Sequence, residues 1–129
     1  MIVMIPISIG ELIDKLSILK IKLKKIADPS KLINIRLEHD MLTQTLDQLN
    51  VGVTHDFIGL SDQLQVINNT LWEVEDDIRE YEHQNDFGSI FITLARSVYR
   101  LNDKRSLIKK QINELFGSTL KEEKSYKTY

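Results

Sequence analysis

The sequence predicts an all-α protein built from two antiparallel helical hairpins, in a bundle-like arrangement, with a short extended segment at the N-terminal end. Apolar residues recur in steps of four and three, which is the spacing of one buried helix face. In two places this pattern stops at a turn and resumes in mirror image, so that apolar positions on the two sides of the turn face each other. The 129 residues contain no cysteine, and they suffice for one domain whose core needs no disulfide.

An extended segment and a helix come first. Residues 2–7 are rich in β-branched residues but include Pro6, so we expect either an edge strand or a lid over the ends of the helices. The first helix is predicted over residues 8–27, because Ser8 is a favourable N-cap and Glu11 follows it at capping-box spacing.

Turn signals separate the remaining helices. Asp28 and Pro29 are a typical N-cap and first-turn pair, so they end one helix and begin the next. The expected order is a helix over 29–50, a loop over 51–59, a helix over 60–83, a turn, and a helix over 88–116 ended by Gly117. The helical domain then spans 1–117, and residues 118–129 are expected to form a polar, loosely ordered tail. Short connections favour an up-down-up-down bundle as the simplest packing.

The second hairpin is longer than the first, so part of it is expected to project from the bundle. We expect the projecting part to be the end with Leu107 and Phe116, which lie off the main apolar stripe. A second subunit commonly covers exposed apolar surface of this kind. The sequence therefore predicts a homodimer.

Two polar residues occupy positions that the apolar pattern places inside. Arg105 faces Ile67 in the second hairpin, and His39 faces Leu19 in the first, where we expect a hydrogen-bonded core histidine. A buried charge is costly unless it is paired, so Arg105 must meet a carboxylate, a carbonyl oxygen or a bound anion, or reach water at the bundle end. Arg105 either sets the register of the hairpin or binds an anion in a pocket near the N-terminal segment.

Polar residues on the outer faces of the second hairpin are the main candidates for function. The third helix presents acidic residues and the fourth presents basic residues. Both sets lie on the face opposite the predicted seam, which is the line of contact between the two helices. Charges of this kind select register and partner more than they add stability, so they are placed to meet another helix or a second subunit. Trp72 and Tyr99 lie beside them, either as candidate interface anchors or as residues that widen the core. The candidate polar residues are Glu73, Asp76, Asp77, Arg96, Arg100, Asp103 and the seam residue Arg105.

No catalytic signature occurs in the chain, which has no glycine-rich phosphate loop and no serine-nucleophile motif. Glu80 and His83 have the Glu-x-x-His spacing of di-iron bundles, but the pair faces outward and has no second copy, so we expect neither metal nor cofactor. A formal charge of −2 without a basic face argues against nucleic acid as a partner. We expect no membrane insertion and a cytoplasmic protein, because no segment has the length and composition of a membrane span or a signal peptide.

Four stretches of the chain resemble an uncharacterised family of small helical proteins of bacteria and phage. The stretches are IPISIGELIDKLSILKIK at 5–22, LWEVEDDIREYE at 71–82, ARSVYRLNDKRSLIKKQIN at 95–113 and EEKSY at 122–126. The resemblance implies no known activity. Genes of this family often lie near sugar-transferase genes of polysaccharide synthesis, which links the resemblance to that process by context alone.

Two functional hypotheses follow. The first is a non-catalytic helical interaction or scaffold protein that self-associates, with its own copy or an unidentified protein as partner. The second is a small enzyme or binding protein for an anion, such as a sugar phosphate or nucleotide sugar, held by Arg96, Arg100 or Arg105. The first hypothesis predicts that Arg100→Ala weakens assembly, and the second predicts that it removes stabilisation by the anion.

Overall fold

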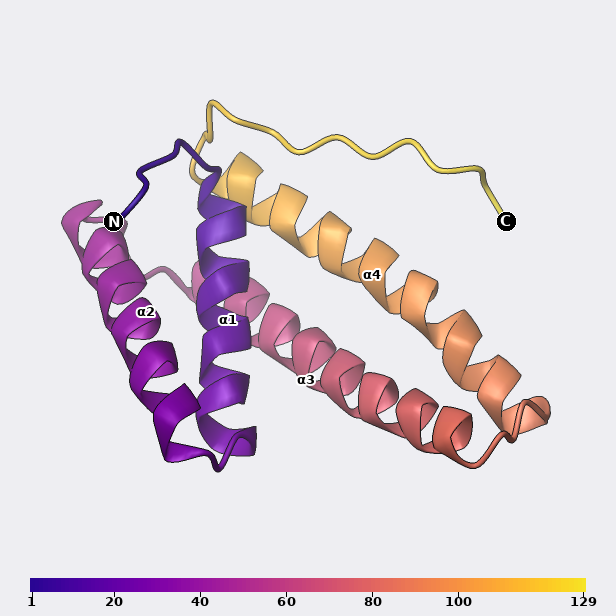
Figure 1. Ribbon diagram of the computed structural model, residues 1–129. Coiled ribbons are helices and arrows are strands. Elements are labelled where there is room, and N and C mark those ends of the chain that lie inside the picture. Colours follow the sequence, from indigo (N-terminus) through magenta and orange to yellow (C-terminus); the bar gives the residue numbers. More distant parts are fainter.

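The computed structural model describes residues 1–129 and contains four helices and no strand (Figure 1). The helices are α1 (Ile9–Lys25), α2 (Pro29–Gln48), α3 (His55–His83) and α4 (Ser89–Leu115). They form two antiparallel hairpins, α1–α2 and α3–α4, which confirms the predicted all-α class. None of the four has a stretch that is long and apolar enough to cross a membrane.

Three predicted helix boundaries follow from local capping. The Ser8 hydroxyl accepts a hydrogen bond from the backbone N–H of Glu11 at 3.2 Å, and the Asp28 carboxylate accepts one from the backbone N–H of Ser30 at 2.9 Å. Gly117 follows α4 with a φ of 61°, the left-handed conformation that glycine adopts without strain. These signals depend only on neighbours in sequence.

The start of α3 differs from the prediction. Its N-cap is Thr54, whose hydroxyl accepts a hydrogen bond from the backbone N–H of Phe57 at 3.2 Å, so the helix begins at His55. Most of the predicted loop over 51–59 is therefore helical. Gly59 lies within the helix because its weak helix propensity is outweighed by the cap and by the packing that follows.

Helix α1 is the central element of the fold. It packs against all three other helices, whereas α2 contacts α1 alone. Figure 1 shows α1 crossing the open end of the α3–α4 hairpin, with α2 on its other side. The four helices therefore do not share one axis as the simplest up-down-up-down packing would require. The buried residues of α1 explain this, because they occupy more than one face of the helix: Gly10, Leu12, Ile13, Asp14, Leu16, Ser17, Leu19 and Ile21.

The hydrophobic core lies where α1 crosses the hairpin. Ile13 of α1 packs there with Leu64 of α3 and with Ile108 and Ile112 of α4. Phe116 packs against this core, and its ring contacts Phe57 edge-to-face at a centroid distance of 5.2 Å. Phe116 is thus partly covered, whereas Leu107 is 57% exposed, as the prediction expects for that end. The part of the hairpin that projects is the turn end, contrary to the prediction (Figure 1).

Candidate functional site

A cluster of charged side chains joins α1, α3 and α4. Its centre is Asp14, which is 1% exposed. Arg105 of α4 binds this carboxylate with two nitrogen atoms, and its Nε lies 2.9 Å from Oδ1. Asn68 of α3 donates a hydrogen bond from Nδ2 to the same oxygen at 2.8 Å. Because a buried carboxylate is stable only when it is paired and hydrogen-bonded, these contacts determine where α1 lies on the hairpin.

Lys109 extends the cluster to the C-terminal tail. Its Nζ lies 2.6 Å from Oε2 of Glu11 and 2.9 Å from Oε2 of Glu122 in the tail. Burial disfavours the charge of Lys109, but the hydrogen bonds to the two glutamates outweigh burial and raise its pKa. The hydrogen bond from Lys109 lowers the pKa of Glu122. The tail is therefore attached to the helices by an ion pair.

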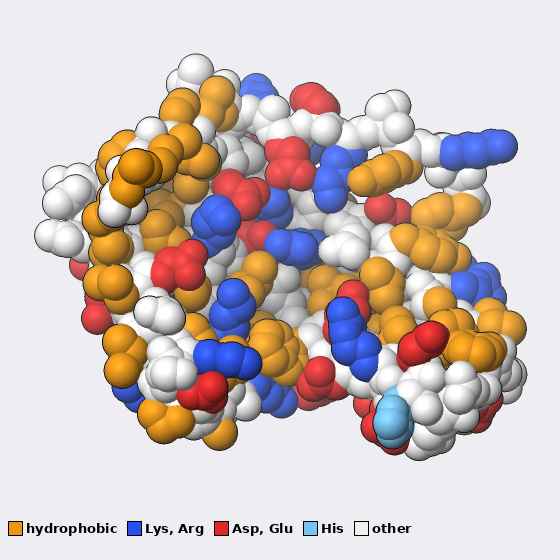
Figure 2. Space-filling view, in the orientation of Figure 1, with side chains coloured by type: hydrophobic (Ala, Val, Ile, Leu, Met, Phe, Trp, Pro, Cys, Tyr) orange, Lys and Arg blue, Asp and Glu red, His pale blue; other side chains and the backbone are white.

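The cluster leaves no positive charge unpaired. Its two cations, Arg105 and Lys109, meet the three carboxylates of Glu11, Asp14 and Glu122. The hydrogen bond to Asp14 raises the pKa of Arg105, so the guanidinium stays charged. The sequence allows Arg105 a carboxylate, a carbonyl oxygen, a bound anion or water as its partner. In the structure the partner is the Asp14 carboxylate. Figure 2 shows charged side chains gathered on this face between the hydrophobic side chains at its two sides.

Gly10 allows the close approach of α1 to α4. Its backbone N–H donates a hydrogen bond to Oδ1 of Asn113 at 2.7 Å. A Cβ atom at this position would lie 2.5 Å from the backbone oxygen of Lys109, so any side chain would push the helices apart. Gly10 thus sets the distance at which the cluster forms.

Asp14, Asn68, Lys109 and Asn113 are not among the residues predicted from the sequence. The sequence does contain a signal that Asp14 is buried, because this carboxylate lies in a helix that is apolar on more than one side. Gly10, Asp14, Ser17 and Ile21 recur at helical spacing and are all buried, so they form a second stripe beside the apolar one. Such a stripe indicates a second packing surface on the helix.

The predicted polar residues of α3 and α4 lie on the surface. No ion pair joins α3 to α4. Glu73 instead meets α1, with its Oε1 3.8 Å from Nζ of Lys25. The acidic and basic stripes of this hairpin therefore do not neutralise each other. The exposed candidate residues are Glu73, Asp76, Asp77, Arg96, Arg100 and Asp103.

The two candidate anchors have different surroundings. Trp72 is half-buried, whereas Tyr99 is 43% exposed and its ring contacts Tyr129 of the tail edge-to-face at 5.2 Å. The Tyr129 hydroxyl donates a hydrogen bond to Oδ2 of Asp103 at 2.8 Å. The Arg100 guanidinium lies 5.8 Å from the centroid of the same ring. The end of the tail thus covers part of the polar stripe of α4.

The weaker candidates form no metal-binding cluster. Glu80 accepts a hydrogen bond from Nε2 of Gln84 at 2.7 Å, and His83 is exposed at the end of α3. No group of three or more His, Asp or Glu side chains is arranged to hold a metal ion. His39 is half-buried on α2, and its Nδ1 lies 3.4 Å from Oδ1 of Asp40.

The turn end of the α3–α4 hairpin has no core of its own. No residue from 75 to 104 is buried, although the apolar stripes continue through this region to the turn. We call residues 75–104 the arm. Phe87, Ile90 and Ile92 near the turn are between 50% and 56% exposed. The half-buried stripe residues of the arm are Ile78, Tyr81, Phe91, Leu94, Val98 and Leu101.

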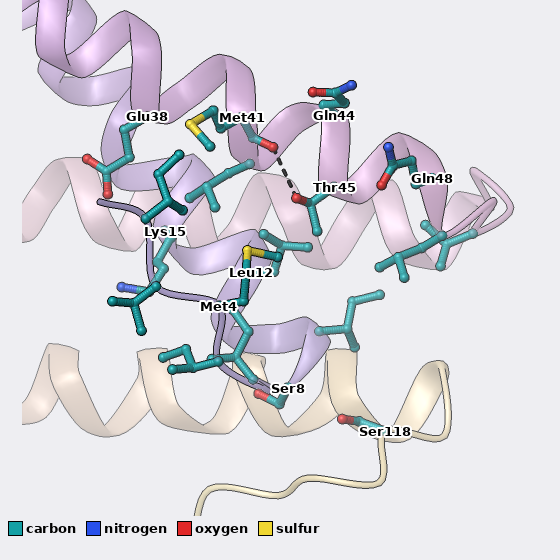
Figure 3. Close-up of a pocket in the computed structure, with 18 of the residues that line it drawn as sticks. Met4, Ser8, Leu12, Lys15, Glu38, Met41, Gln44, Thr45, Gln48 and Ser118 are labelled. Atoms are coloured by element: carbon teal, nitrogen blue, oxygen red, sulfur yellow. Dashed lines mark hydrogen bonds between the residues drawn. The ribbon is translucent and has the colours of Figure 1, made fainter.

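A groove of about 940 Å³ lies at the other end of the molecule, between residues 1–7 and α2 (Figure 3). Residues 1–7 are extended but pair with no strand, so they act as one wall of the groove. Met4 from this segment and Met41 from α2 project into the space between them (Figure 3). Most of the lining is apolar, and its only charged residues are Lys15 and Glu38.

Comparison with known proteins gives one family. A family model described as a family of unknown function, DUF6165, matches residues 3–129. No curated protein and no solved structure matches the chain. The matched residues include the charged cluster, the arm and most of the groove. The chain therefore belongs to the DUF6165 family of unknown function.

Proposed function

We propose that this protein is a non-catalytic helical scaffold that self-associates and binds a helical partner through the arm. The observation that carries the proposal is that none of residues 75–104 is buried, although the arm keeps its apolar stripes. Helices of this kind gain most of their stability by burying an apolar face. The apolar surface of the arm is therefore available to a partner.

The charges of the arm specify the kind of partner. Acidic residues of α3 and basic residues of α4 are both exposed, and no ion pair joins them. A partner helix pair with basic residues opposite α3 and acidic residues opposite α4 would satisfy both stripes, and like charges would reject the reverse orientation. Each exposed pair contributes only about 0–1 kcal/mol, so apolar contact would supply the affinity and the charges the register.

The charged cluster supports a structural role for the other end of the hairpin. Arg105 and Asn68 donate hydrogen bonds to the Asp14 carboxylate, and Lys109 donates hydrogen bonds to two glutamates. Groups that are engaged in this way serve to hold helices together. They do not offer a free acid, base or cation to a substrate.

The test compares charge reversal on the arm with charge reversal outside it. Purified wild-type chain, Arg100→Glu and the control Lys110→Glu serve as baits for affinity capture, since both residues are exposed on α4. We expect wild type and Lys110→Glu to retain the same bound protein and Arg100→Glu to lose it, with equal melting temperatures for all three. Equal capture by the three baits would overturn the arm as the docking surface. A wild-type chain that sediments as a monomer at every concentration would overturn self-association.

Two arginines on the arm favour a second candidate function, the binding of an anion. The neighbouring Arg96 and, to a smaller extent, Arg100 lower the pKa of Tyr99. Neither arginine has an ion-pair partner in the chain. Arg105 does not join them, because it is bound to Asp14. A sugar phosphate or nucleotide sugar at this place would raise the melting temperature of wild type and not that of an Arg96→Ala/Arg100→Ala double variant. Uridine diphosphate glucose is a suitable probe, and no shift in wild type at millimolar concentration would exclude this function.

A further inference from the structure

We infer that residues 1–7 form an intermolecular strand, through which two copies of this chain pair and cover each other's groove. The inference rests on the proposed self-association and deepens it, because it names the second copy as the occupant of the groove. The groove and the arm lie at opposite ends of the molecule, so this dimer would leave both arms free (Figure 1).

The backbone of residues 1–7 has no partner within its own chain. The segment is extended, yet none of its N–H or C=O groups takes part in the backbone hydrogen bonds outside the helices. An unpaired extended segment is a template for another strand. An identical segment is self-complementary in the antiparallel direction, because a two-fold axis makes the two sides of the ladder equivalent. Pairing centred on Met4 places Pro6, which has no N–H, opposite Ile2 near the end of the ladder.

The composition of the segment also indicates burial on both faces. Strands with one face in water alternate apolar and polar residues, whereas a continuous apolar run is typical of a strand that is covered on both faces. Residues 1–7 are apolar throughout, but Ile2, Val3, Met4 and Ile5 are between 67% and 84% exposed in the single chain. The single chain therefore does not supply the surroundings that this sequence requires.

The shape of the groove favours a chain segment over a small molecule. Its floor includes the buried Leu12, but its α2 wall is open, with Leu37 62% exposed and Leu49 51% exposed. Small-molecule sites enclose most of their ligand, which an open groove of this kind does not do. Met4 and Met41 have flexible side chains that adapt to an incoming apolar segment (Figure 3).

This end of the molecule exposes eight large apolar side chains, each at least 36% accessible. A stable interface buries about 800 Å² on each partner, and a contiguous apolar patch beyond a few hundred Å² is unusual on a monomer. The rim carries one charge of each sign, from Lys15 and Glu38, so two copies do not repel each other there. The exposed apolar residues that one two-fold contact would cover are Ile2, Val3, Met4, Ile5, Ile7, Leu37, Met41 and Leu49.

The first measurement is the oligomeric state by sedimentation velocity. We expect wild type to sediment at twice the chain mass of 15.0 kDa and Met4→Glu to raise the dissociation constant of the dimer at least tenfold. Ile33→Glu is the matched control, because Ile33 is 65% exposed on α2 and does not line the groove. Both variants should keep the melting temperature of the monomer. A monomeric wild type, or a dimer that Met4→Glu does not weaken, would overturn the inference.

The second measurement uses the absence of cysteine from the chain. Met4→Cys then carries one thiol per copy, close to the proposed two-fold axis, where two Cα atoms about 4–7 Å apart can form a disulfide. We expect Met4→Cys to form a cross-linked dimer on mild oxidation much faster than Ile33→Cys. Equal rates for the two variants would overturn pairing at this segment.

Arg100→Glu separates this inference from the proposed role of the arm. We expect Arg100→Glu to remain a dimer with wild-type affinity, because the arm lies away from the groove. A dimer that is lost in Arg100→Glu and kept in Met4→Glu would place self-association on the arm. That result would overturn the inference about residues 1–7 and leave the proposed function standing.

Discussion

The two ends of the α3–α4 hairpin share one apolar repeat but differ in what covers it. At the open end α1 crosses the hairpin, and Leu64, Ile108 and Ile112 are no more than 6% exposed. In the arm, Leu94 and Val98 continue the same repeat but remain half-buried, because no third helix lies over them. An apolar repeat thus defines a stripe on a helix, and the neighbouring elements decide whether that stripe becomes core or docking surface.

The largest effect that would test this contrast is expected at the charged cluster. Asp14→Ala leaves Arg105 and Lys109 without their shared carboxylate, and loss of one partner from a buried pair costs about 3–5 kcal/mol of unfolding free energy. Asp76→Ala is the control on the arm, and its exposed position predicts a change below about 0.5 kcal/mol. Urea unfolding measures both. Equal losses in the two variants would contradict the contrast between the two ends.

A smaller difference is expected between two leucines of the same repeat. Leu64 is 0% exposed, so Leu64→Ala should lower the free energy of unfolding by about 2–5 kcal/mol. Leu94 is half-buried in the arm, so Leu94→Ala should cost about 1 kcal/mol. Urea unfolding of the two variants gives the comparison directly. A cost at Leu94 that matches the cost at Leu64 would show that the arm has a core after all.

Two glycines sharpen the comparison further. Gly10→Ala places a Cβ against the backbone of α4, and overpacking of this kind costs about 1–3 kcal/mol. Gly59 lies in α3 with open space around it, so Gly59→Ala should raise the free energy of unfolding by about 0.5–1 kcal/mol. Thermal unfolding reports the sign of each change. A destabilised Gly59→Ala, or a Gly10→Ala as stable as wild type, would contradict the packing described above.

The smallest effect concerns the ion pair that attaches the tail. The pKa of Glu122 is lower in the folded chain than its ordinary value of 4.5, so its contribution is present above that pH and disappears as the pH falls through the folded pKa. The pair is partly exposed, and Glu122→Gln should therefore cost less than about 1 kcal/mol at neutral pH. Urea unfolding between about pH 3 and pH 7 should show the two stabilities converging at low pH.

Glu123→Gln is the matched control for this pH dependence, because Glu123 is exposed and forms no ion pair. Its stability should follow wild type at every pH. The pKa of Lys109 is raised above the ordinary lysine value of 10.5. Deprotonation of Lys109 therefore removes the stability contributed by the pair only as the pH rises above that value. A difference between Glu122→Gln and wild type that persists at acid pH would contradict this account.

The sequence alone determined the helices and most of their ends. Ser8, Asp28 with Pro29, and Gly117 act on neighbouring backbone groups, so their effect can be predicted without knowledge of the fold. The apolar repeat likewise identified the apolar stripe of each helix and the half-buried position of Arg105. Local spacing carries this information because a helix presents every third or fourth residue on one face.

Only the tertiary structure decided which elements cover these stripes. Periodicity shows that a face is apolar but not which neighbour will bury it, so the crossing of α1 over the open end and the projection of the arm could not be predicted. The pair of Asp14 and Arg105 is separated by 91 positions, and no local rule connects them. Their contact follows from the close approach of α1 and α4 at Gly10, which exists only once the helices have packed.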